Sequence, residues 1–407
     1  KYGWLRGHDI STTDWQELLP KSEFYLFIPR DNNLFSMYEQ YPKITDIFSV
    51  NSVGIVTARD NLTIKWTSND VWSTVSDFSL LDPESARLKY NLSKDTENWK
   101  VELAQNDLRD IGLERKRIVP ILYRPFDIRY TYYTGRSRGF HCRPILEVMK
   151  HMLEGENLAI ITARSNKSNQ MDHFFCTNKI METKCGESTT QSSIFPLYIY
   201  SNAEEKDLTN QEKEQSQKQP NINSKIFSTL SDAYKREPTP EEILYYIYSV
   251  LYSNVYRTKY SEFLRMDFPR IPFTRDYAIF SKMGIYGKRL IDLHLLESSE
   301  LDNPIARFQG EGEGKVGKLR YDDEQGHVYI NADQYFEGVT KEIWEYQIGG
   351  YQVCQKWLKD RKDRTLSLDE IKHYSKIVTT LQKTMEIQKL IDEIYPEVEK
   401  EIIEFPY

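Results

Sequence analysis

A polar segment at residues 201–224 limits most strongly how this chain of 407 residues can fold. The segment consists mainly of Glu, Lys, Gln, Asn and Ser, and it contains no aromatic residue. A stretch of this composition cannot bury a hydrophobic core, so we expect a flexible insertion or linker here. We therefore predict two domains, residues 1–200 and 225–407, joined by residues 201–224.

The residues before the polar segment predict short strands mixed with helices. Apolar runs typical of buried strands occur at 23–29, 52–58, 157–163 and 194–200. Residues 97–113 show the helical spacing of apolar side chains that marks an amphipathic helix. This first domain is therefore expected to contain a mixed sheet covered by helices.

The residues after the polar segment predict mostly helices. Capping boxes, in which a Ser or Thr and a Glu three residues later satisfy the start of a helix, occur at Thr239–Glu242 and Ser367–Glu370. Residues 275–296 predict a helix interrupted by two glycines, and residues 318–331 predict a small hairpin. The predicted fold class is α/β (α+β), a mixed-sheet domain followed by a mainly helical domain with a small β-hairpin.

Between Pro120 and Pro144, arginines alternate with apolar and aromatic residues. A period of two predicts strands. From Arg109 to His151 there are ten Lys/Arg against four Asp/Glu, a local charge of +6 in a chain of net charge −7. Positive charge gathered beside aromatic residues in an acidic protein indicates an anionic partner, with nucleic acid the leading class. The alternative is an ordinary solvated strand face on which arginine stems cover aromatic rings.

Two short segments resemble each other, SVGIVTARDN at Ser52–Asn61 and NLAIITARSN at Asn157–Asn166. In each, a buried strand is expected to end with Arg and Asn presented just beyond it. These are side chains that read the edges of guanine and adenine in DNA. The other explanation is that the Asn caps a turn. A match over ten residues only suggests a structural duplication.

The composition limits the class of protein. No run of 18 apolar residues occurs, so no membrane-spanning segment is expected. The four cysteines are few and scattered, which fits a reducing cytoplasm. The first residue is Lys rather than Met and no apolar signal sequence follows it, so we interpret the chain as a fragment or a processed product.

Two motifs resemble catalytic motifs, but neither matches closely enough to predict catalysis. Gly310–Lys315 (GEGEGK) lacks the spacing and the hydroxyl residue of a phosphate-binding loop. Asp172, Glu182 and Lys184 follow the D…ExK order of magnesium-dependent nucleases, but such a short pattern arises often by chance. We therefore predict no catalytic residue in this chain.

A metal site is also not expected. His173, Cys176 and Cys185 lack both a paired C-x-x-C motif and a fourth zinc ligand. His294 stands in an apolar helical stretch and is interpreted as a packed histidine.

Several longer motifs follow one another in a fixed order. They are ILYRPFDIRY (121–130), RPILEVMKHM (143–152), ENLAIITAR (156–164), FPLYIY (195–200), TPEEILYYIYSVLYS (239–253), DFPRIP (267–272), LIDLHLL (290–296) and IGGYQVCQKWLKDR (348–361). In this order they resemble the C-terminal specificity region of single-chain, type ISP-like restriction-modification enzymes and related adenine-specific DNA methyltransferases. The resemblance covers nearly the whole chain.

The resemblance implies that residues 1–200 are a target recognition domain and that the helical region supports it. It implies a bacterial, cytoplasmic protein whose partners are double-stranded DNA and the upstream methyltransferase and helicase-like domains of a parent chain. It implies no cofactor in this region, whereas S-adenosylmethionine, ATP and magnesium would serve the rest of the parent. The expected function is the choice of the DNA sequence at which the parent methylates or starts cleavage. The alternatives are a magnesium-dependent nuclease or a protein-docking module.

A target recognition domain needs cations on phosphates for affinity and forked side chains on base edges for choice. The base-edge candidates are Arg59, Asn61, Arg164, Asn166, Lys167, Lys184 and Gln191. The phosphate candidates are Arg124, Arg129, Arg136, Arg138, Arg143 and Lys150.

Overall fold

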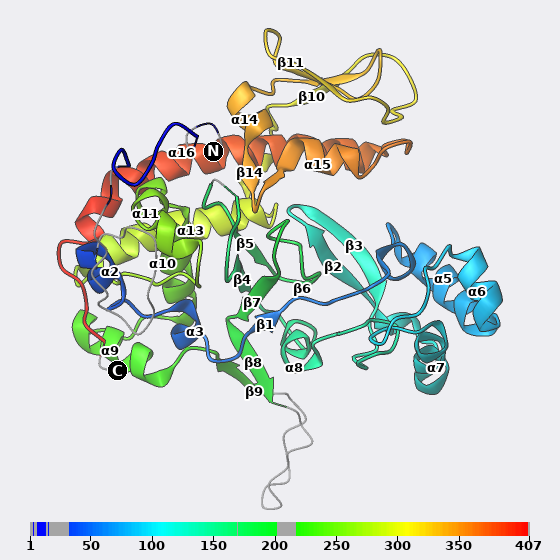
Figure 1. Ribbon diagram of the computed structural model, residues 1–407, viewed down its shortest axis with the longest axis horizontal. Coiled ribbons are helices and arrows are strands. Elements are labelled where there is room, and N and C mark those ends of the chain that lie inside the picture. The colour runs from blue at the N-terminus through cyan, green and yellow to red at the C-terminus, as the bar shows by residue number, and fades with distance from the viewer. Residues whose placement is uncertain are drawn as a thin grey trace, which may run out of the picture.

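The computed structural model describes residues 32–168, 170–201 and 217–405, together with Gly3, residues 6–13 and Trp15. The strand expected at 23–29 and most of the polar segment lie outside the described residues. The described chain forms a mixed α/β structure with several small sheets (Figure 1), which confirms the predicted fold class.

A four-stranded sheet in the order β1-β7-β4-β5 lies at the centre of the molecule (Figure 1). Its strands are β1 (Ser52–Val53), β4 (Ala159–Ala163), β5 (Phe174–Thr177) and β7 (Ser192–Pro196), and all neighbours pair antiparallel. Every residue of β4, β5 and β7 is buried, so both faces of the sheet are covered. The strands expected at 157–163 and in the first part of 194–200 are therefore confirmed.

Successive side chains of the central sheet enter two different hydrophobic clusters, because they point to opposite faces. Ile160 packs with the helices α10 (Pro240–Tyr252) and α13 (Tyr277–His294), on one face. Ile161 packs on the other face, with side chains of α16 (Leu368–Val398). Each of these two clusters contains residues from both sides of the polar segment 201–224.

The arginine-rich stretch forms a hairpin beside the central sheet. Strands β2 (Ile118–Arg124) and β3 (Asp127–Tyr132) pair antiparallel, and β6 (Ile180–Met181) joins β2 in parallel. The predicted strands are thus confirmed up to Tyr132, and residues 133–144 form a loop. The helices α5 (Ser68–Leu80), α6 (Pro83–Lys89) and α7 (Val101–Ile111) pack beyond the hairpin around a third cluster drawn only from residues 56–142.

Short elements connect these parts. They are α2 (Asn32–Tyr38), α3 (Ile44–Ile47), α4 (Asp60–Thr63), the 3₁₀ helix η1 (Arg115–Arg117), α8 (Leu146–Met149), η2 (Lys150–Met152), β8 (Tyr198–Ser201), β9 (Gln217–Pro220), α9 (Ser224–Tyr234), α11 (Asn254–Lys259), α12 (Ser261–Leu264), η3 (Ser299–Leu301), α14 (Lys341–Glu345), β14 (Gln347–Ile348), β15 (Tyr351–Gln352) and α15 (Val353–Lys359).

Both predicted capping boxes are present. The Thr239 side chain accepts from the N–H of Glu242 at the start of α10, and Ser367 does the same for Glu370 at the start of α16. The expected interruption of the helix at 275–296 is wrong, because α13 runs unbroken through Gly284 and Gly287. A Cβ on Gly287 would lie 1.8 Å from the carbonyl oxygen of Tyr245 in α10, so this glycine allows the two helices to approach closely.

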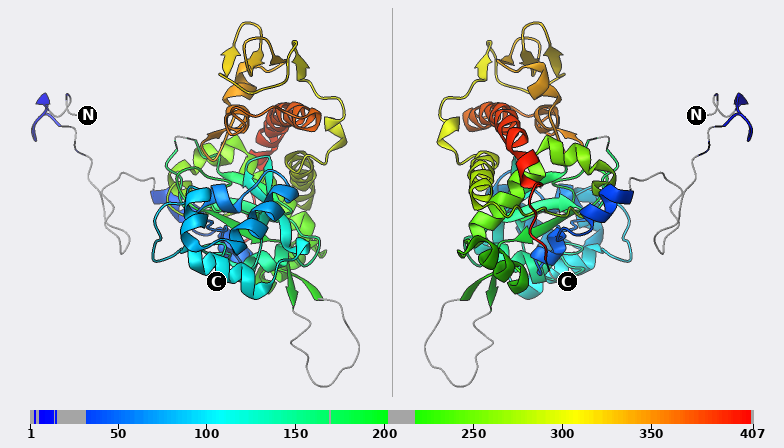
Figure 2. Two further views of the ribbon diagram at one scale, coloured as in Figure 1. Left: turned by 90° about the vertical axis from the view of Figure 1, so that its right-hand side faces the viewer. Right: turned by 90° about the vertical axis from the view of Figure 1, so that its left-hand side faces the viewer.

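A second four-stranded sheet projects beyond α16 and α15 (Figure 2). It consists of β10 (Arg307–Gln309), β11 (Arg320–Asp322), β12 (His327–Tyr329) and β13 (Tyr335–Glu337). The β11–β12 pair confirms the hairpin predicted at 318–331, whereas β10 and β13 were not predicted. No helix in the described part of the chain is long and apolar enough to cross a membrane.

Candidate nucleic-acid interface

Two loops meet at one end of the central sheet, residues 164–168 after β4 and residues 184–191 before β7. We call them the sheet-end loops. Ala163 pairs with Ser192, so Arg164 and Gln191, the next residues outward, lie opposite each other. The hydroxyl of Thr190 also lies 2.8 Å from the carbonyl oxygen of Ser165. The two loops are therefore in direct contact.

Four base-edge candidates are exposed on the sheet-end loops. They are Arg164, Lys167, Lys184 and Gln191. The side chain of Arg164 is 75% exposed, and its Nε lies 3.4 Å from an oxygen of Asp267, a pair that solvent screens. Four side chains from two separate segments of the sequence are thus available to an external ligand.

Arg143 belongs to the same part of the molecule. The backbone of Ile55 bonds to Met181 and Thr183, and the backbone of the next residue, Val56, exchanges two hydrogen bonds of 3.0 Å with Arg143. Segment 55–56 therefore lies between Thr183 and Arg143. Two spacings of about 4.8 Å put these flanking backbones about 10 Å apart.

Three further phosphate candidates differ in exposure. Arg138 is exposed and has a left-handed φ of 58°, and its N–H closes the loop on the carbonyl of Cys142 at 2.9 Å. Arg136 is 56% exposed and pairs with Asp110 at 2.7 Å. Lys150 lies half-buried in η2. Loop 133–144 therefore carries exposed cations, and Arg143 is the one whose backbone contacts place it near the sheet-end loops.

Asn166 does not face a ligand. It is 3% exposed, and its side-chain oxygen accepts the N–H of Ser168 at 2.7 Å. Its amide nitrogen donates to the carbonyl of Gln170 at 3.0 Å and contacts Nδ1 of His173 at 2.8 Å. The structure thus supports turn capping for Asn166, and we withdraw it from the base-edge candidates.

The look-alike segment at 52–61 ends differently. The chain turns at Ala58, which has a φ of 65°, whereas the matching Ala163 lies within β4. The guanidinium of Arg59 consequently folds back onto the carbonyl of Lys94 at 3.0 Å and lies 4.8 Å from the ring centre of Trp99. Arg59 is half-buried and Asn61 is exposed. The two segments therefore differ in structure at their Arg and Asn residues, and the suggested structural duplication does not extend to them.

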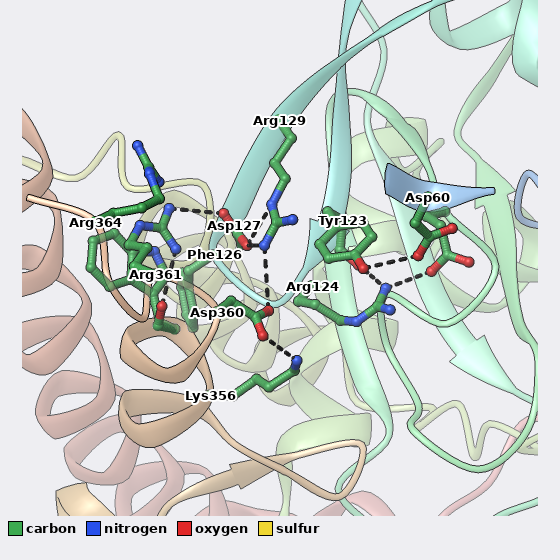
Figure 3. Close-up of polar contacts among 12 residues, drawn as sticks. Asp60, Tyr123, Arg124, Phe126, Asp127, Arg129, Lys356, Asp360, Arg361 and Arg364 are labelled. Atoms are coloured by element: carbon green, nitrogen blue, oxygen red, sulfur yellow. Dashed lines mark hydrogen bonds and ion pairs between the residues drawn. The ribbon is translucent and has the colours of Figure 1, made fainter. Parts of the chain in front are cut away.

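Arg124 and Arg129 point into the protein (Figure 3). Arg124 is 12% exposed and pairs with Glu182 at 2.5 Å. Arg129 is 11% exposed and pairs with Asp127 at 2.8 Å and with Asp360 at 3.4 Å. A phosphate would have to displace a buried carboxylate from either arginine, so we exclude both from the candidate interface.

The tip of the β2–β3 hairpin docks on the turn after α15 and on α16 (Figure 3). Arg361 lies 2.9 Å from Asp127, and Nε2 of His373 contacts the carbonyl of Phe126 at 2.8 Å. Burial alone would raise the pKa of Asp127, but Arg361 and Arg129 lower it below the ordinary value. We call Asp127, Arg129, Asp360 and Arg361 the hairpin contact. No local sequence pattern predicts the hairpin contact, because its two sides lie more than 200 residues apart in the chain.

Asp172, Glu182 and Lys184, the D…ExK motif, do not form a metal site within the described residues. Asp172 is 6% exposed, and neither of its side-chain oxygens has a hydrogen-bond partner. Burial raises the pKa of Asp172 to about 6. Glu182 is occupied by Arg124, and the N–H of Lys184 donates to it at 2.9 Å. In the described residues no three His, Cys, Asp or Glu side chains could hold a metal ion together.

The remaining nominated residues are internal. His173, Cys176 and Cys185 are buried and do not form a metal cluster within the described chain. His294 bonds through one ring nitrogen to the hydroxyl of Tyr248 at 2.6 Å and through the other to Thr384 at 2.9 Å. The interpretation of His294 as a packed histidine is confirmed.

Comparison with known families gives one match over most of the chain. The family described as the Type ISP C-terminal specificity domain matches residues 46–390. No curated protein sequence matches the chain.

Solved structures share the fold. The nuclease-deletion mutant of the Type ISP restriction-modification enzyme LlaGI, in complex with a DNA substrate mimic, is 19% identical with a TM-score of 0.63 over 93% of this chain and 36% of that one. The DrdV–DNA complex is 19% identical with a TM-score of 0.67 over 98% of this chain and 42% of that one. The ATP-dependent Type ISP enzyme LlaBIII bound to DNA is 18% identical with a TM-score of 0.62 over 86% and 24%. The chain therefore spans less than half the length of each of these enzymes.

Proposed function

The chain belongs to the Type ISP C-terminal specificity domain family, and from this membership we propose that it selects the DNA sequence on which a restriction-modification enzyme acts. The observation that carries the proposal is the gathering of exposed cationic and amide side chains at one end of the central sheet. These side chains come from three separate segments and are Arg143, Arg164, Lys167, Lys184 and Gln191.

Each of these side chains has a chemical role that fits base recognition. Arginine and lysine donate to O6 and N7 of guanine in the major groove, which suits Arg164, Lys167 and Lys184. A glutamine amide both donates and accepts, which matches adenine and suits Gln191. The exposed cations of loop 133–144 would meet phosphates and fix the register of the duplex.

The wider activity belongs to a longer protein. We place methylation, ATP hydrolysis and cleavage in domains outside this chain, with S-adenosylmethionine, ATP and magnesium bound there. The partners of this chain would be double-stranded DNA and those upstream domains, in a bacterial cytoplasm. The four cysteines of the chain are free, which agrees with a reducing compartment.

Selection from a pool of randomised duplexes tests the proposal. We expect one sequence to be enriched. It should bind at least 100-fold more tightly than a random duplex of equal length; specific DNA-binding proteins typically reach a ratio of roughly 10³–10⁷. Arg164→Ala should weaken binding of the enriched duplex by about 1–3 kcal/mol, the cost of one base contact.

Arg307→Ala is the matched control, because Arg307 is an exposed arginine on the small sheet β10–β13. It should leave the binding of both duplexes unchanged. The absence of any enriched sequence would overturn the proposal. An equal loss of selected and random binding in Arg164→Ala would remove Arg164 from base recognition.

A further inference from the structure

We infer that Glu187 is a positioning residue whose buried carboxylate sets sequence discrimination by holding the sheet-end loops in one conformation. The inference rests on the proposed function, since it concerns how the same surface reads DNA. The role assigned to Glu187 is indirect, because its side chain is fully buried and cannot touch a base.

The Glu187 carboxylate is held by hydrogen bonds from the two residues that precede Gln191. The N–H of Thr189 donates to it at 2.7 Å and the Thr189 hydroxyl at 3.0 Å. The N–H of Thr190 also donates to it, and the Thr190 hydroxyl lies 2.9 Å away. No ion pair involves Glu187 within the described residues, so these donors alone compensate for its burial.

The same hydrogen bonds reach the second loop. The Thr190 hydroxyl lies 2.9 Å from the Glu187 carboxylate and 2.8 Å from the carbonyl of Ser165. A hydroxyl carries one proton and can donate to only one of these at a time, but both contacts need Thr190 in this place. Glu187 therefore fixes the position of Thr190, and through Thr190 the relation of the two sheet-end loops.

The loop also rests on a close backbone contact with the helical region. A Cβ on Gly349 would lie 1.9 Å from the carbonyl oxygen of Gly186, and Gly349 has a left-handed φ of 57°. The N–H of Ser188 donates to the carbonyl of Gly349 at 2.9 Å, and the Tyr351 hydroxyl donates to the carbonyl of Lys184, also at 2.9 Å. Gly349 and Tyr351 thus hold the backbone on both sides of Glu187. The Glu187 carboxylate holds the next part of the loop, Thr189 and Thr190.

Holding the sheet-end loops in one conformation should matter more for the preference between DNA sequences than for the overall affinity for DNA. A bidentate contact with a base edge requires side chains held to a fraction of an ångström, and ordering a loose loop on binding costs free energy. Phosphate contacts by exposed cations tolerate small displacements of the backbone. Loss of the Glu187 carboxylate should therefore reduce the preference for the selected sequence while leaving random-sequence binding in place.

The test compares Glu187→Gln with wild type on selected and random duplexes. The amide keeps the shape of the side chain but removes its negative charge and one of its two acceptor oxygens. The N–H groups of Thr189 and Thr190, which both donate to one oxygen of Glu187, then lose the charge that strengthens their hydrogen bonds. We expect the ratio of selected to random affinity to fall at least 10-fold, with random-sequence affinity within 2-fold of wild type. Glu313→Gln is the matched control, because Glu313 is exposed on a different loop, and it should leave the ratio unchanged.

Thr190→Val and Thr190→Ser keep the test decisive if Glu187→Gln does not fold. Valine removes the hydroxyl that contacts both loops, and we expect the ratio to fall; serine keeps the hydroxyl and should restore at least half of the lost preference on a logarithmic scale. A folded Glu187→Gln with an unchanged ratio overturns the inference. Equal losses of selected and random binding also overturn it, as do identical ratios in the two Thr190 variants.

The proposed function and this inference fail in different ways. If the wild-type protein enriches no sequence, the proposed function fails and the inference falls with it. If wild type discriminates and Glu187→Gln discriminates equally well, only the inference fails.

Discussion

The hairpin contact and the sheet-end loops both contain or cover buried carboxylates, but within the described residues ion pairs with arginine hold them only in the hairpin contact. In the hairpin contact, Asp127 lies 2.9 Å from Arg361 and 2.8 Å from Arg129; Asp127 and Arg361 are buried and Arg129 is mostly buried. Behind the sheet-end loops, the side-chain oxygens of Asp172 have no hydrogen-bond partner, and Glu187 is held by uncharged donors. The nearby Arg164 faces solvent instead.

This difference shows why the number of arginines in a segment does not measure its capacity to bind an anion. A guanidinium that neutralises an internal carboxylate is used by the fold and is not available outside. The Glu187 carboxylate is held by uncharged donors, so it takes up none of the cations of the sheet-end loops. The location of the carboxylate partners, rather than the local charge of the sequence, separates structural from binding arginines.

The largest effect that we expect is the loss of free energy of unfolding on the substitution Arg361→Ala. The change leaves Asp127 buried with one of its two guanidinium partners removed, and breaking a buried pair in this way costs about 3–5 kcal/mol. Chemical denaturation measures the free energy of unfolding, with Arg307→Ala as the exposed control. The folded variant should keep the wild-type preference for the selected duplex. A loss below about 1 kcal/mol would contradict the contrast drawn between the two regions.

The second effect concerns pH and Asp172. Since burial raises its pKa to about 6, the folded state binds a proton more readily than the unfolded state, and stability should fall as pH rises from about 4 to about 6. A shift of about two pKa units corresponds to roughly 3 kcal/mol. Asp172→Asn should flatten this dependence, as measured by denaturation across that pH range.

Asp302→Asn is a suitable control for this measurement, because Asp302 is exposed and should leave the pH dependence as in wild type. If Asp172→Asn and wild type give parallel curves between pH 4 and 6, the buried Asp172 carboxylate is neutralised by a partner and resembles Asp127 after all.

The smallest effect is expected for Arg143→Ala. Arg143 is exposed, so the free energy of unfolding should change by less than about 0.5 kcal/mol. Loss of one phosphate contact should lower the slope of log affinity against log salt by about 1 and weaken selected and random duplexes alike. An unchanged slope would mean that Arg143 does not meet a phosphate. Lys282→Ala, at an exposed residue of α13, should not alter the slope.

Local signals predicted much of the fold. The alternation up to Tyr132 predicted β2 and β3, and the capping residues Thr239 and Ser367 predicted the starts of α10 and α16. These features depend on neighbours in the sequence. Gly287 was misread for the opposite reason, because its effect depends on the carbonyl of Tyr245 in another helix, which no local pattern contains.

The candidate site divides in the same way. The resemblance of the two TAR segments brought attention to Arg164, which is exposed, but Asn166 is turned inward by its partners and Arg59 folds back onto the carbonyl of Lys94. Glu187 was missed. The only hint is the run Ser-Thr-Thr after it, which supplies the donors that a buried carboxylate needs.

The two hydrophobic clusters that cross the polar segment have a consequence for how specificity can diversify within the family. One hydrophobic cluster contains side chains from residues 38–48 and 160–197 together with side chains of α10 and α13. The two halves of the chain therefore share this core. Exchange of residues 32–201 alone between two relatives would leave mismatched packing on both faces of the central sheet. If the sheet-end loops read the target as proposed, a new target sequence is more accessible through single replacements on their outward side than through recombination of halves.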